Sequence, residues 1–362
     1  MRVVQILPEL NEGGVERGTI ELAKEFDKNN IESFIISGGG NLLNQLKNSK
    51  TKHIRCNVFS KNILTFIPRV FILRRILRDI SPDIVHVRSR FPAWILYFAK
   101  HNLNFKIVST VHGLNSPNCY SKIMTKADRI ICVSNYVKNH VIKHFKTPTS
   151  KIKVIFRGVD LSNFDPKALP DKYTIRENFG YKKDDFIIAC VGRISQTKNI
   201  QTLIKAVSII KRTHPNIKAL IVGSVHKKRK KYFEMLLNIR KELKVEQNVI
   251  FTGNVNNISQ IYKLCDVIIS PSIKPESFGR SIAEAISINT PVVASNHGGV
   301  KDIIIENTNG YFFEPTDENE LAKKILKAKG LKFDGFNYIS KTFNLANMSK
   351  DTIELYKEIL SE

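Results

Sequence analysis

Short apolar runs alternate with amphipathic helical patterns along most of this chain, and this alternation restricts the fold more than any other feature. In the first half, five runs have the length and composition of buried strands, at residues 3–7, 34–37, 84–87, 107–111 and 130–133. The same pattern begins again with runs at residues 186–191, 219–222, 249–251, 267–270 and 291–294. Strands that alternate with helices form parallel sheets covered by helices on both faces. The sequence therefore predicts an α/β protein with two doubly wound, Rossmann-like sheets.

The division into domains follows from where this pattern weakens. We expect a first domain over residues 1–157 and a second over residues 186–340. Between them, residues 158–185 contain Pro166 and Pro170 and have the composition of a linker. A last amphipathic helix is expected at residues 349–360, with Ser349 as its N-cap. A chain of 362 residues is long enough for two hydrophobic cores.

Ligands of parallel sheets bind at the carboxyl ends of the strands, and four loops of the first half lie there. The first loop ends in two glycines, the second of which is Gly14, and a helix follows. The second loop carries Arg88 and Arg90, and the third carries His112. In the fourth, Ser134 is a candidate helix cap. A histidine in such a loop has either a structural or a catalytic role; the nearby arginines favour the catalytic one.

The stretch from residue 271 to 294 joins two strand-like runs through a loop and a short helix. Glu276 lies in the loop, Glu284 lies within the helix, and Phe278, Gly279 and Arg280 fall at the helix start. The first amides of a helix have no intrahelical partner and carry the positive end of its dipole, so such a start suits phosphate. The two carboxylates could bind hydroxyls on either side. A nucleotide sugar offers this layout, although the stretch could also be only a strand-to-helix connection.

A second cationic loop follows the first strand of the second half. Arg193 and Lys198 lie there, just before a helix, and would place two positive charges at a diphosphate. Such cations would neutralise a leaving nucleoside diphosphate without a metal ion. The sequence contains no Asp-x-Asp motif, and its five cysteines are scattered without zinc-ligand spacing. We therefore expect no metal site and no cofactor other than the nucleotide-sugar substrate.

Together these motifs resemble those of glycosyltransferase family 4, whose E-x7-E pattern is matched by Glu276 and Glu284. The resemblance covers nearly the whole chain; one departure is Asn199, at a position where glycine is usual. It implies the GT-B fold: two Rossmann-like domains facing a cleft, with a C-terminal helix that returns to the first domain, here residues 341–362. It also implies transfer with retention of anomeric configuration.

The resemblance assigns donor-binding roles to particular residues. Arg193 and Lys198 would bind the pyrophosphate, and Glu284 would bind the ribose hydroxyls. Glu276 would contact hydroxyls of the transferred sugar. It is a candidate catalytic residue through that contact, and no nucleophilic role is assigned to it. The backbone of Phe278, Gly279 and Arg280 would contact sugar and phosphate.

The first domain would supply the acceptor side. Gly14 resembles the glycine whose amide closes over the donor phosphates, and His112 resembles the histidine beside the reaction centre. The stretch 86–94 resembles family members that build bacterial lipopolysaccharide or surface polysaccharide. Under that interpretation Arg88 and Arg90 would bind an anionic group of a lipid-linked or polysaccharide acceptor.

Charge points to the same class of partner. The net charge is +24, and residues 1–158 carry 26 Lys and Arg against 10 Asp and Glu. Within them, residues 64–80 form a basic amphipathic segment that either lies in a membrane interface or is a buried helix with a solvated basic edge. The apolar N-terminal run is too short for a signal peptide. We therefore expect a cytoplasmic protein, bound peripherally to the inner face of a bacterial inner membrane.

Two alternative functions remain. The first keeps the fold but catalyses a soluble reaction, as a sugar-nucleotide epimerase or a free-glycoside synthase. The second is a basic nucleic-acid-binding protein, for which the charge and the basic block at residues 226–231 are the arguments. The sequence has no nucleic-acid recognition module, and that function leaves Glu276 and Glu284 unexplained. We therefore expect no nucleic-acid partner.

Overall fold

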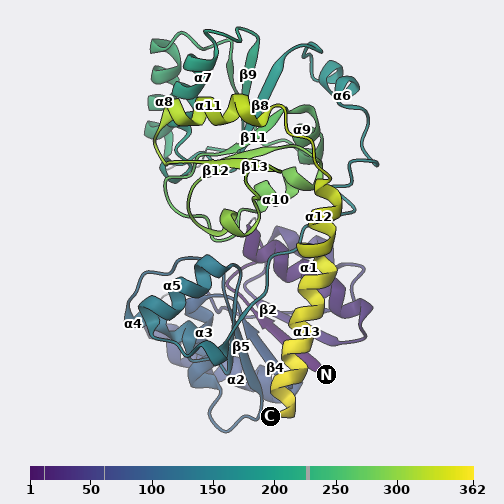
Figure 1. The fold of residues 1–362 in the computed structure, drawn as a ribbon. Helices are drawn as coiled ribbons and strands as arrows, with labels where there is room; N and C mark the ends of the chain where they lie inside the picture. Colours follow the sequence, from purple (N-terminus) through teal and green to yellow (C-terminus); the bar gives the residue numbers. More distant parts are fainter. Residues whose placement is uncertain (12, 61, 226–228) are drawn as a thin grey trace. The chain divides into compact units, whose positions relative to one another are not determined.

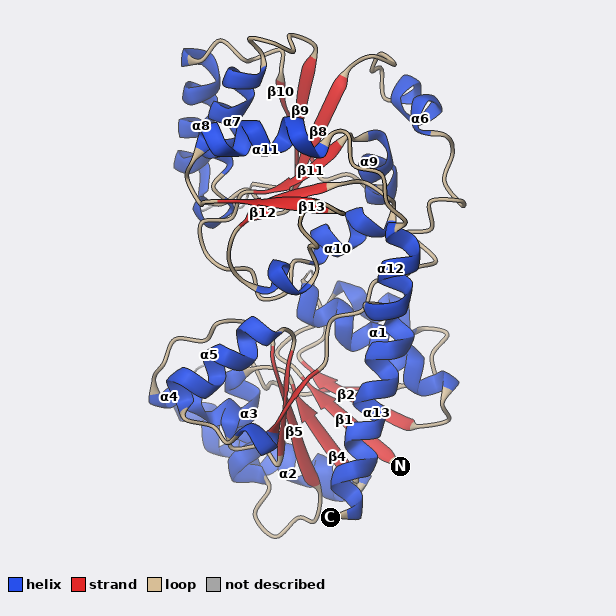
Figure 2. Cartoon of the chain, in the orientation of Figure 1, coloured by secondary structure: helices blue, strands red, loops and turns tan. Residues whose placement is uncertain are grey.

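The computed structural model describes residues 1–11, 13–60, 62–225 and 229–362. Residues 226–228 of the basic block lie outside the described residues. The chain divides into two compact units, Met1–Gly158 with Leu345–Glu362 and Val159–Asn344. Each unit contains one sheet flanked by helices (Figure 1, Figure 2). No described helix is both long enough and apolar enough to span a bilayer.

The first unit is built on a seven-stranded sheet in the order β3-β2-β1-β4-β5-β6-β7, in which all neighbouring strands are parallel. Its strands are β1 (Arg2–Ile6), β2 (Glu32–Ser37), β3 (Lys52–Arg55), β4 (Ile84–Val87), β5 (Lys106–Val111), β6 (Arg129–Cys132) and β7 (Ile152–Val154). Its α-helices are α1 (Gly14–Lys28), α2 (Phe66–Ile80), α3 (Arg90–Ala99), α4 (Cys119–Lys122), α5 (Asn135–Phe145) and α13 (Leu345–Ser361). Short 3₁₀ turns are η1 (Asn41–Leu46), η2 (Ile63–Thr65), η3 (Ile123–Thr125) and η4 (Thr149–Lys151).

The second unit has a six-stranded parallel sheet in the order β10-β9-β8-β11-β12-β13. Its strands are β8 (Phe186–Val191), β9 (Ile217–Val222), β10 (Val249–Gly253), β11 (Val267–Ser270), β12 (Val292–Ser295) and β13 (Gly310–Phe313). Its α-helices are α6 (Lys172–Asn178), α7 (Ile200–Ile210), α8 (Lys230–Glu242), α9 (Ile258–Leu264), α10 (Arg280–Ser287), α11 (Glu318–Ala328) and α12 (Gly335–Thr342). Two 3₁₀ turns are η5 (Gln196–Lys198) and η7 (Gly299–Asp302). The prediction of two Rossmann-like parallel sheets is confirmed.

Both sheets reverse their strand order at one point, and this point sets where ligands can bind. The chain adds β2 and β3 on one side of β1, then crosses to add β4 to β7 on the other. In the second unit the chain reverses in the same way between β8 and β11. Loops that leave the two central strands diverge to opposite faces of the sheet, which opens a crevice at their carboxyl ends.

The last helix, α13, packs on the first unit through an apolar stripe. Ile353, Tyr356 and Ile359 join the core that contains Phe26 of α1 and Val3 of β1. Because the stripe repeats every three to four residues, one face of the helix is continuously buried.

The helix begins at Leu345, four residues before the helical pattern at 349–360 and four after the start of the returning segment 341–362. The prediction that Ser349 is its N-cap is therefore wrong: Ser349 lies inside α13 and is buried. The extra turn is held by Gly158, whose amide donates to Met348 Sδ at 3.4 Å. In contrast, Ser134 caps α5 as predicted, since its hydroxyl accepts from the Val137 amide.

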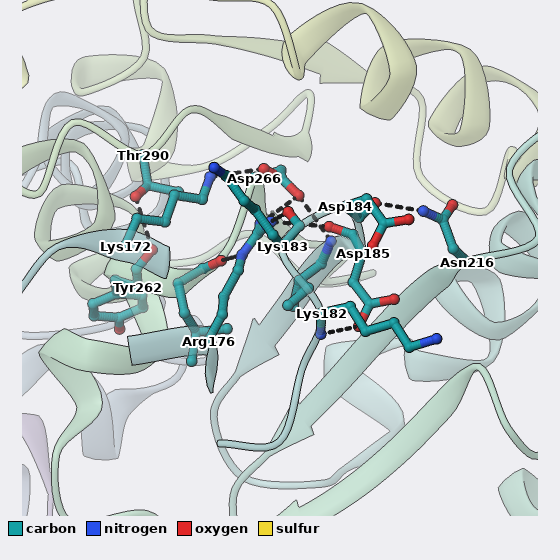
Figure 3. Close-up of polar contacts among 12 residues, drawn as sticks. Lys172, Arg176, Lys182, Lys183, Asp184, Asp185, Asn216, Tyr262, Asp266 and Thr290 are labelled. Carbon is teal, nitrogen blue, oxygen red and sulfur yellow. Dashed lines mark hydrogen bonds and ion pairs between the residues drawn. The ribbon is translucent and has the colours of Figure 1, made fainter. Parts of the chain in front are cut away.

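Of residues 158–185, which the sequence predicts to be a linker, Gly158 belongs to the first unit, and the rest lie within the second unit and include α6. Figure 3 shows the side chains of Lys172 and Arg176 converging on Asp266. Lys172 Nζ donates to Asp266 Oδ1 at 2.7 Å and Arg176 Nη2 donates to Oδ2 at 2.8 Å. The Ile187 amide also donates to this carboxylate, at 2.8 Å. This half-buried cluster joins α6 to the amino ends of β8 and β11, the edge of the sheet opposite to the loops that carry the predicted site residues.

Candidate active site

In the second unit, the two predicted donor-binding loops flank the strand-order reversal. The loop with Arg193 and Lys198 follows β8, and the loop with Glu276 follows β11, the neighbouring strand. The sequence separates Lys198 from Glu276 by 78 positions, yet their side chains meet: Lys198 Nζ donates to Glu276 Oε1 at 2.6 Å. The fold therefore brings the predicted phosphate-binding cation and sugar-binding carboxylate together.

Glu276 is held ionised by a converging set of donors. Besides Lys198, the hydroxyls of Ser270 and Ser272 donate to Oε1, at 2.9 Å and 2.7 Å. Burial alone would raise the pKa of Glu276, but the charge of Lys198 and the three donated hydrogen bonds outweigh it and lower the pKa below its usual value. The same pairing raises the pKa of Lys198, although burial acts in the opposite direction. Both groups are therefore charged at neutral pH.

Arg193 differs from Lys198 in its surroundings. It is exposed and forms no hydrogen bond or ion pair with any other residue that the structure describes. Its charge nevertheless acts on Lys198, whose pKa it tends to lower. Asn199, which follows Lys198, adopts a left-handed backbone with φ of 50°. Asparagine tolerates this conformation better than most residues, so the turn forms without the glycine that is usual there.

Glu284 forms a second carboxylate site on α10. Arg280 Nε donates to Glu284 Oε1 at 2.8 Å, and the Tyr262 hydroxyl donates to Oε2 at 2.9 Å. Glu284 is buried, with 7% of its surface exposed. Burial, followed by the charge of Glu284, raises the pKa of Tyr262 well above its ordinary value, so the phenol remains a donor. The carboxylate is thus preorganised rather than freely rotating.

The start of α10 requires glycine. Gly279 has φ of 100°, a left-handed conformation that side chains strain, and a Cβ there would fall 2.6 Å from Val300 Cγ1. The amides of Ile282 and Ala283 both donate to the Gly279 carbonyl, so the preceding amides of the first turn have no intrahelical partner. Phe278 is buried and packs against Phe343, with ring centroids 5.9 Å apart.

In the first unit, three predicted residues follow adjacent strands. Gly14 follows β1, Arg88 follows β4 and His112 follows β5. Arg88 is buried and its Nε donates to Gln5 Oε1 at 3.0 Å. Burial lowers its pKa to about 10, so it remains charged at neutral pH. Arg90 lies elsewhere: it is the first residue of α3 and donates to the hydroxyl of Ser121 in α4.

That environment separates the two predicted acceptor arginines. Arg90 Nη1 donates to Ser121 Oγ at 3.1 Å and its guanidinium lies over the ring of Tyr120, 5.3 Å from the centroid. Arg88 instead faces Gln5 and the buried histidines. The two arginines are close in sequence, but their side chains contact different parts of the first unit.

His112 is kept neutral by its surroundings. Burial lowers its pKa well below the ordinary value, and the charges of Arg157 and Arg88 and the nearby His86 act in the same direction. Arg157 Nη1 lies 3.3 Å from His112 Nδ1. A neutral imidazole at this position can exchange hydrogen bonds with a substrate but carries no charge.

Several residues that support these sites were not among the predicted ones. Ser270 and Ser272 had a visible signal, since they end a buried strand and start the loop after it. Tyr262 and Arg157 had none, because their roles depend on packing between elements distant in sequence. Gly299 also supports Glu276: its amide donates to the Glu276 carbonyl at 2.7 Å.

Comparison with known proteins gives a consistent result for both units. A family model described as Glycosyltransferase Family 4 matches residues 12–163, and one described as Glycosyl transferases group 1 matches residues 171–332. A glycosyltransferase from Rickettsia africae ESF-5, known from a crystal structure, is 32% identical in sequence to this chain, with a TM-score of 0.90. The match covers 99% of this chain and 98% of the Rickettsia chain.

Two further proteins extend the comparison. An uncharacterized glycosyltransferase of Methanocaldococcus jannaschii is 29% identical over 303 residues, which are 76% of this chain and 75% of the relative. Anabaena HepE, crystallised in complex with UDP-glucose, is 21% identical in sequence, with a TM-score of 0.84. The match covers 99% of this chain and 100% of the HepE chain. The similarity to HepE concerns the fold, which is GT-B. The chain therefore belongs to the family 4 glycosyltransferases.

Proposed function

We propose that the protein is a retaining, metal-independent glycosyltransferase that moves a sugar from a nucleoside diphosphate to a lipid-linked or polysaccharide acceptor in bacterial cell-envelope biosynthesis. The observation that carries this proposal is the contact between Lys198 and Glu276 beside the strand-order reversal of the second unit, with Glu284 fixed on α10, the helix that follows the Glu276 loop. Cations and fixed carboxylates in that place match the chemistry of a nucleotide sugar.

The donor would bind to the second unit through groups of opposite charge. Arg193 and Lys198 would neutralise the diphosphate, and the first amides of α10 would add the positive end of the helix dipole. Glu284 would accept hydrogen bonds from the ribose hydroxyls, and Glu276 would accept them from the transferred sugar. HepE binds UDP-glucose on a similar fold, which supports a donor of this class.

Transfer would take place on one face of the sugar. The bond between the anomeric carbon and the leaving phosphate breaks, and the acceptor oxygen bonds to that carbon on the same face. The acceptor proton passes to the leaving phosphate oxygen, so no protein nucleophile is needed. The charges of Arg193 and Lys198 stabilise the developing negative charge on the diphosphate. Gly14 and His112 would contribute from the first unit.

An anionic acceptor fits the charge of the first unit. Residues 1–158 have an excess of 16 positive charges, from 26 Lys and Arg against 10 Asp and Glu. Arg88 brings a buried positive charge next to His112, and Arg90 places a second one at the start of α3. Phosphate or carboxylate groups are the ligands that guanidinium groups bind best.

An exposed apolar surface on η2, α2 and α3 supports a lipid-linked acceptor. The sequence predicts that Phe66, Val70, Leu73 and Leu77 share one helical face; of these, Leu73 and Leu77 are buried in the structure. Other apolar side chains of η2, α2 and α3 are exposed. We call six of them the apolar surface: Ile63 (83% exposed), Leu64 (85%), Ile67 (65%), Phe71 (65%), Tyr97 (51%) and Phe98 (50%).

The basic residues of α2 differ in their contacts. Arg74 Nη1 donates to the carbonyls of Ala99 and His101 and therefore joins α2 to the end of α3. Arg75 and Arg78 are exposed and point charge toward solvent, with Asp79 as a nearby carboxylate. Insertion of the apolar surface into the headgroup region, with Arg75 and Arg78 near lipid phosphates, would hold the protein peripherally at the inner face of the membrane.

Two experiments test the proposed function. Radiolabelled UDP-, GDP- and ADP-sugars are screened for transfer to extracted lipid-linked acceptors with EDTA present, and the anomeric configuration of the product is determined by NMR. Retained configuration with EDTA supports the proposal; an inverted product or an absolute metal requirement contradicts it. A salt-dependent shift of DNA or RNA without any transfer would favour the nucleic-acid alternative.

Membrane binding is tested separately by sedimentation with anionic vesicles. An Ile67→Asp/Phe71→Asp variant should lose about tenfold or more in affinity, since each substitution places a charge in an exposed apolar surface. Ile305→Asp, an exposed apolar position of the second unit, is the matched control and should bind as the wild type does. Equal binding by all three proteins would exclude the apolar surface as the membrane contact.

A further inference from the structure

Arg157 forms a bridge between two elements of the first unit that carry predicted site residues. It lies in the loop after β7 and is buried. Its Nη1 lies 3.3 Å from His112 Nδ1, and its Nη2 donates to the carbonyl of Gly14, the first residue of α1. One guanidinium thus contacts both the loop after β5 and the start of the helix after β1.

This contact determines which nitrogen of His112 carries the proton. A guanidinium only donates hydrogen bonds, so Nδ1 must be the acceptor in the contact with Arg157. A neutral imidazole then has its proton on Nε2. Nε2 is buried and has no hydrogen-bond partner among the described residues. His112 therefore presents an unused N–H donor.

Gly18 provides the space in which the guanidinium lies. It is a buried residue of α1, and a Cβ at this position would fall 2.3 Å from Arg157 Nη2 and 2.6 Å from Cζ. Both distances are shorter than real contacts of a Cβ, so any side chain at position 18 would displace the guanidinium. Because glycine weakens helices relative to alanine, its presence within α1 is explained by this close approach.

We propose that Arg157, seated against Gly18, is a positioning residue that holds His112 as a neutral Nε2–H donor toward an oxygen of the glycosyl substrate. The inference rests on the role in transfer proposed for His112. It assigns that histidine a hydrogen-bond donor function and excludes it as a general base, because the lone pair that could take a proton is on Nδ1 and is occupied.

The charged groups around His112 set the direction of the expected change. Arg157 and Arg88 both lower its pKa, as does His86 on β4, while burial is the largest cause. Glu21 of α1 and Tyr356 of α13 act on Arg88. Removal of Arg157 deletes one of the cations that oppose protonation, so the pKa of His112 must rise while the Nδ1 lone pair becomes available.

The test combines histidine-selective ¹⁵N NMR with kinetics on the full chain. Arg157→Ala removes the guanidinium, and Gly18→Ala displaces it by a single methyl group while favouring the helix. His112→Gln identifies the ring signals of this residue among the nine histidines. Gly330→Ala is the matched control, because a Cβ there meets nothing within 4 Å.

Wild type should show an unprotonated Nδ1 and a protonated Nε2 at neutral pH. Gly18→Ala and Arg157→Ala should show mixed tautomers and protonation of the ring at higher pH than in the wild type. Their kcat should fall about tenfold or more, with the affinity for UDP unchanged. Gly330→Ala should match the wild type in all three readouts.

An unchanged ring in Gly18→Ala overturns the positioning role of Arg157, whether or not Arg157→Ala folds. A changed ring with unchanged kcat overturns the role of His112 in transfer, which belongs to the proposed function. The NMR signals are independent of turnover, so the two failures are distinguishable.

Discussion

Removal of Lys198 should destabilise the second unit, because it leaves the Glu276 carboxylate without its cation. The two side chains are 25% and 18% exposed, and their N–O distance is 2.6 Å. Breaking a buried ion pair from one side costs about 3–5 kcal/mol. Partial exposure and the hydroxyls of Ser270 and Ser272 reduce this cost, so we expect Lys198→Ala to lower the free energy of unfolding by about 2 kcal/mol.

A double-mutant cycle separates the pair from its surroundings. Glu276→Gln removes the carboxylate charge, so Lys198→Ala should cost about 1.5 kcal/mol less in that background than in the wild type. Unfolding in urea is monitored by circular dichroism, and the free energy of unfolding is taken from the transition of the second unit. Lys205→Ala is the matched control, because its pair with Glu318 is longer, at 3.5 Å, and more exposed. It should cost less than about 0.5 kcal/mol.

Ligand binding gives the same cycle a second readout. Loss of the charge-assisted contact between Lys198 and a phosphate should weaken UDP binding about 30-fold, equivalent to about 2 kcal/mol. Glu276→Gln frees Lys198 from its competitor and should bind UDP at least as tightly as the wild type, yet lose affinity for the UDP-sugar. Additive unfolding energies together with unchanged UDP affinity in Lys198→Ala would refute this account of the pair.

Three further predictions concern single groups. The pKa of Glu276 is lowered, so its contribution to stability is fully present above its unfolded pKa of about 4.5 and is lost as the pH falls through the lower folded value. In urea titrations, the loss of unfolding free energy in Glu276→Gln should therefore be constant around neutral pH and become smaller only below about pH 4.5. Glu284→Ala should weaken UDP binding about tenfold by calorimetry, since the ribose loses its acceptor; an unchanged affinity would contradict the assignment. Tyr356→Phe should destabilise the first unit by about 1–2 kcal/mol, because its hydroxyl lies 2.5 Å from His86 Nδ1 in a buried site; a thermal transition equal to that of the wild type would contradict this.

The sequence predicts the buried strands well and the edge strands poorly. All ten runs that we expected to be strands are strands, because parallel strands covered on both faces must be continuously apolar. The strands β3, β7 and β13, which were not predicted, lie at edges of their sheets, and β3 and β7 have no buried residue; β13 is mostly buried, and the edge strand β10 was predicted. In β3 every residue is exposed or half-buried, so it has no apolar run to recognise.

The site divides in a similar way. Residues that follow strands could be located from the sequence, because the carboxyl end of a parallel sheet collects them whatever their separation. Their partners could not be located: Tyr262 reaches Glu284 from α9, and Arg157 reaches His112 from beyond β7. Such contacts depend on how helices and loops pack, which no local pattern encodes. Ser349 illustrates the same limit, since tertiary contact at Gly158 extends α13 past a plausible cap.

The central claim is that side-chain cations neutralise the donor diphosphate in place of a divalent ion. Calorimetric titration of UDP and its sugar conjugate into wild type and an Arg193→Ala/Lys198→Ala variant, both in EDTA, tests it most directly. We expect saturable binding by the wild type in EDTA and loss of that binding in the double variant. Equal affinity in the two proteins, or binding by the wild type only after Mg²⁺ or Mn²⁺ is restored, would contradict it.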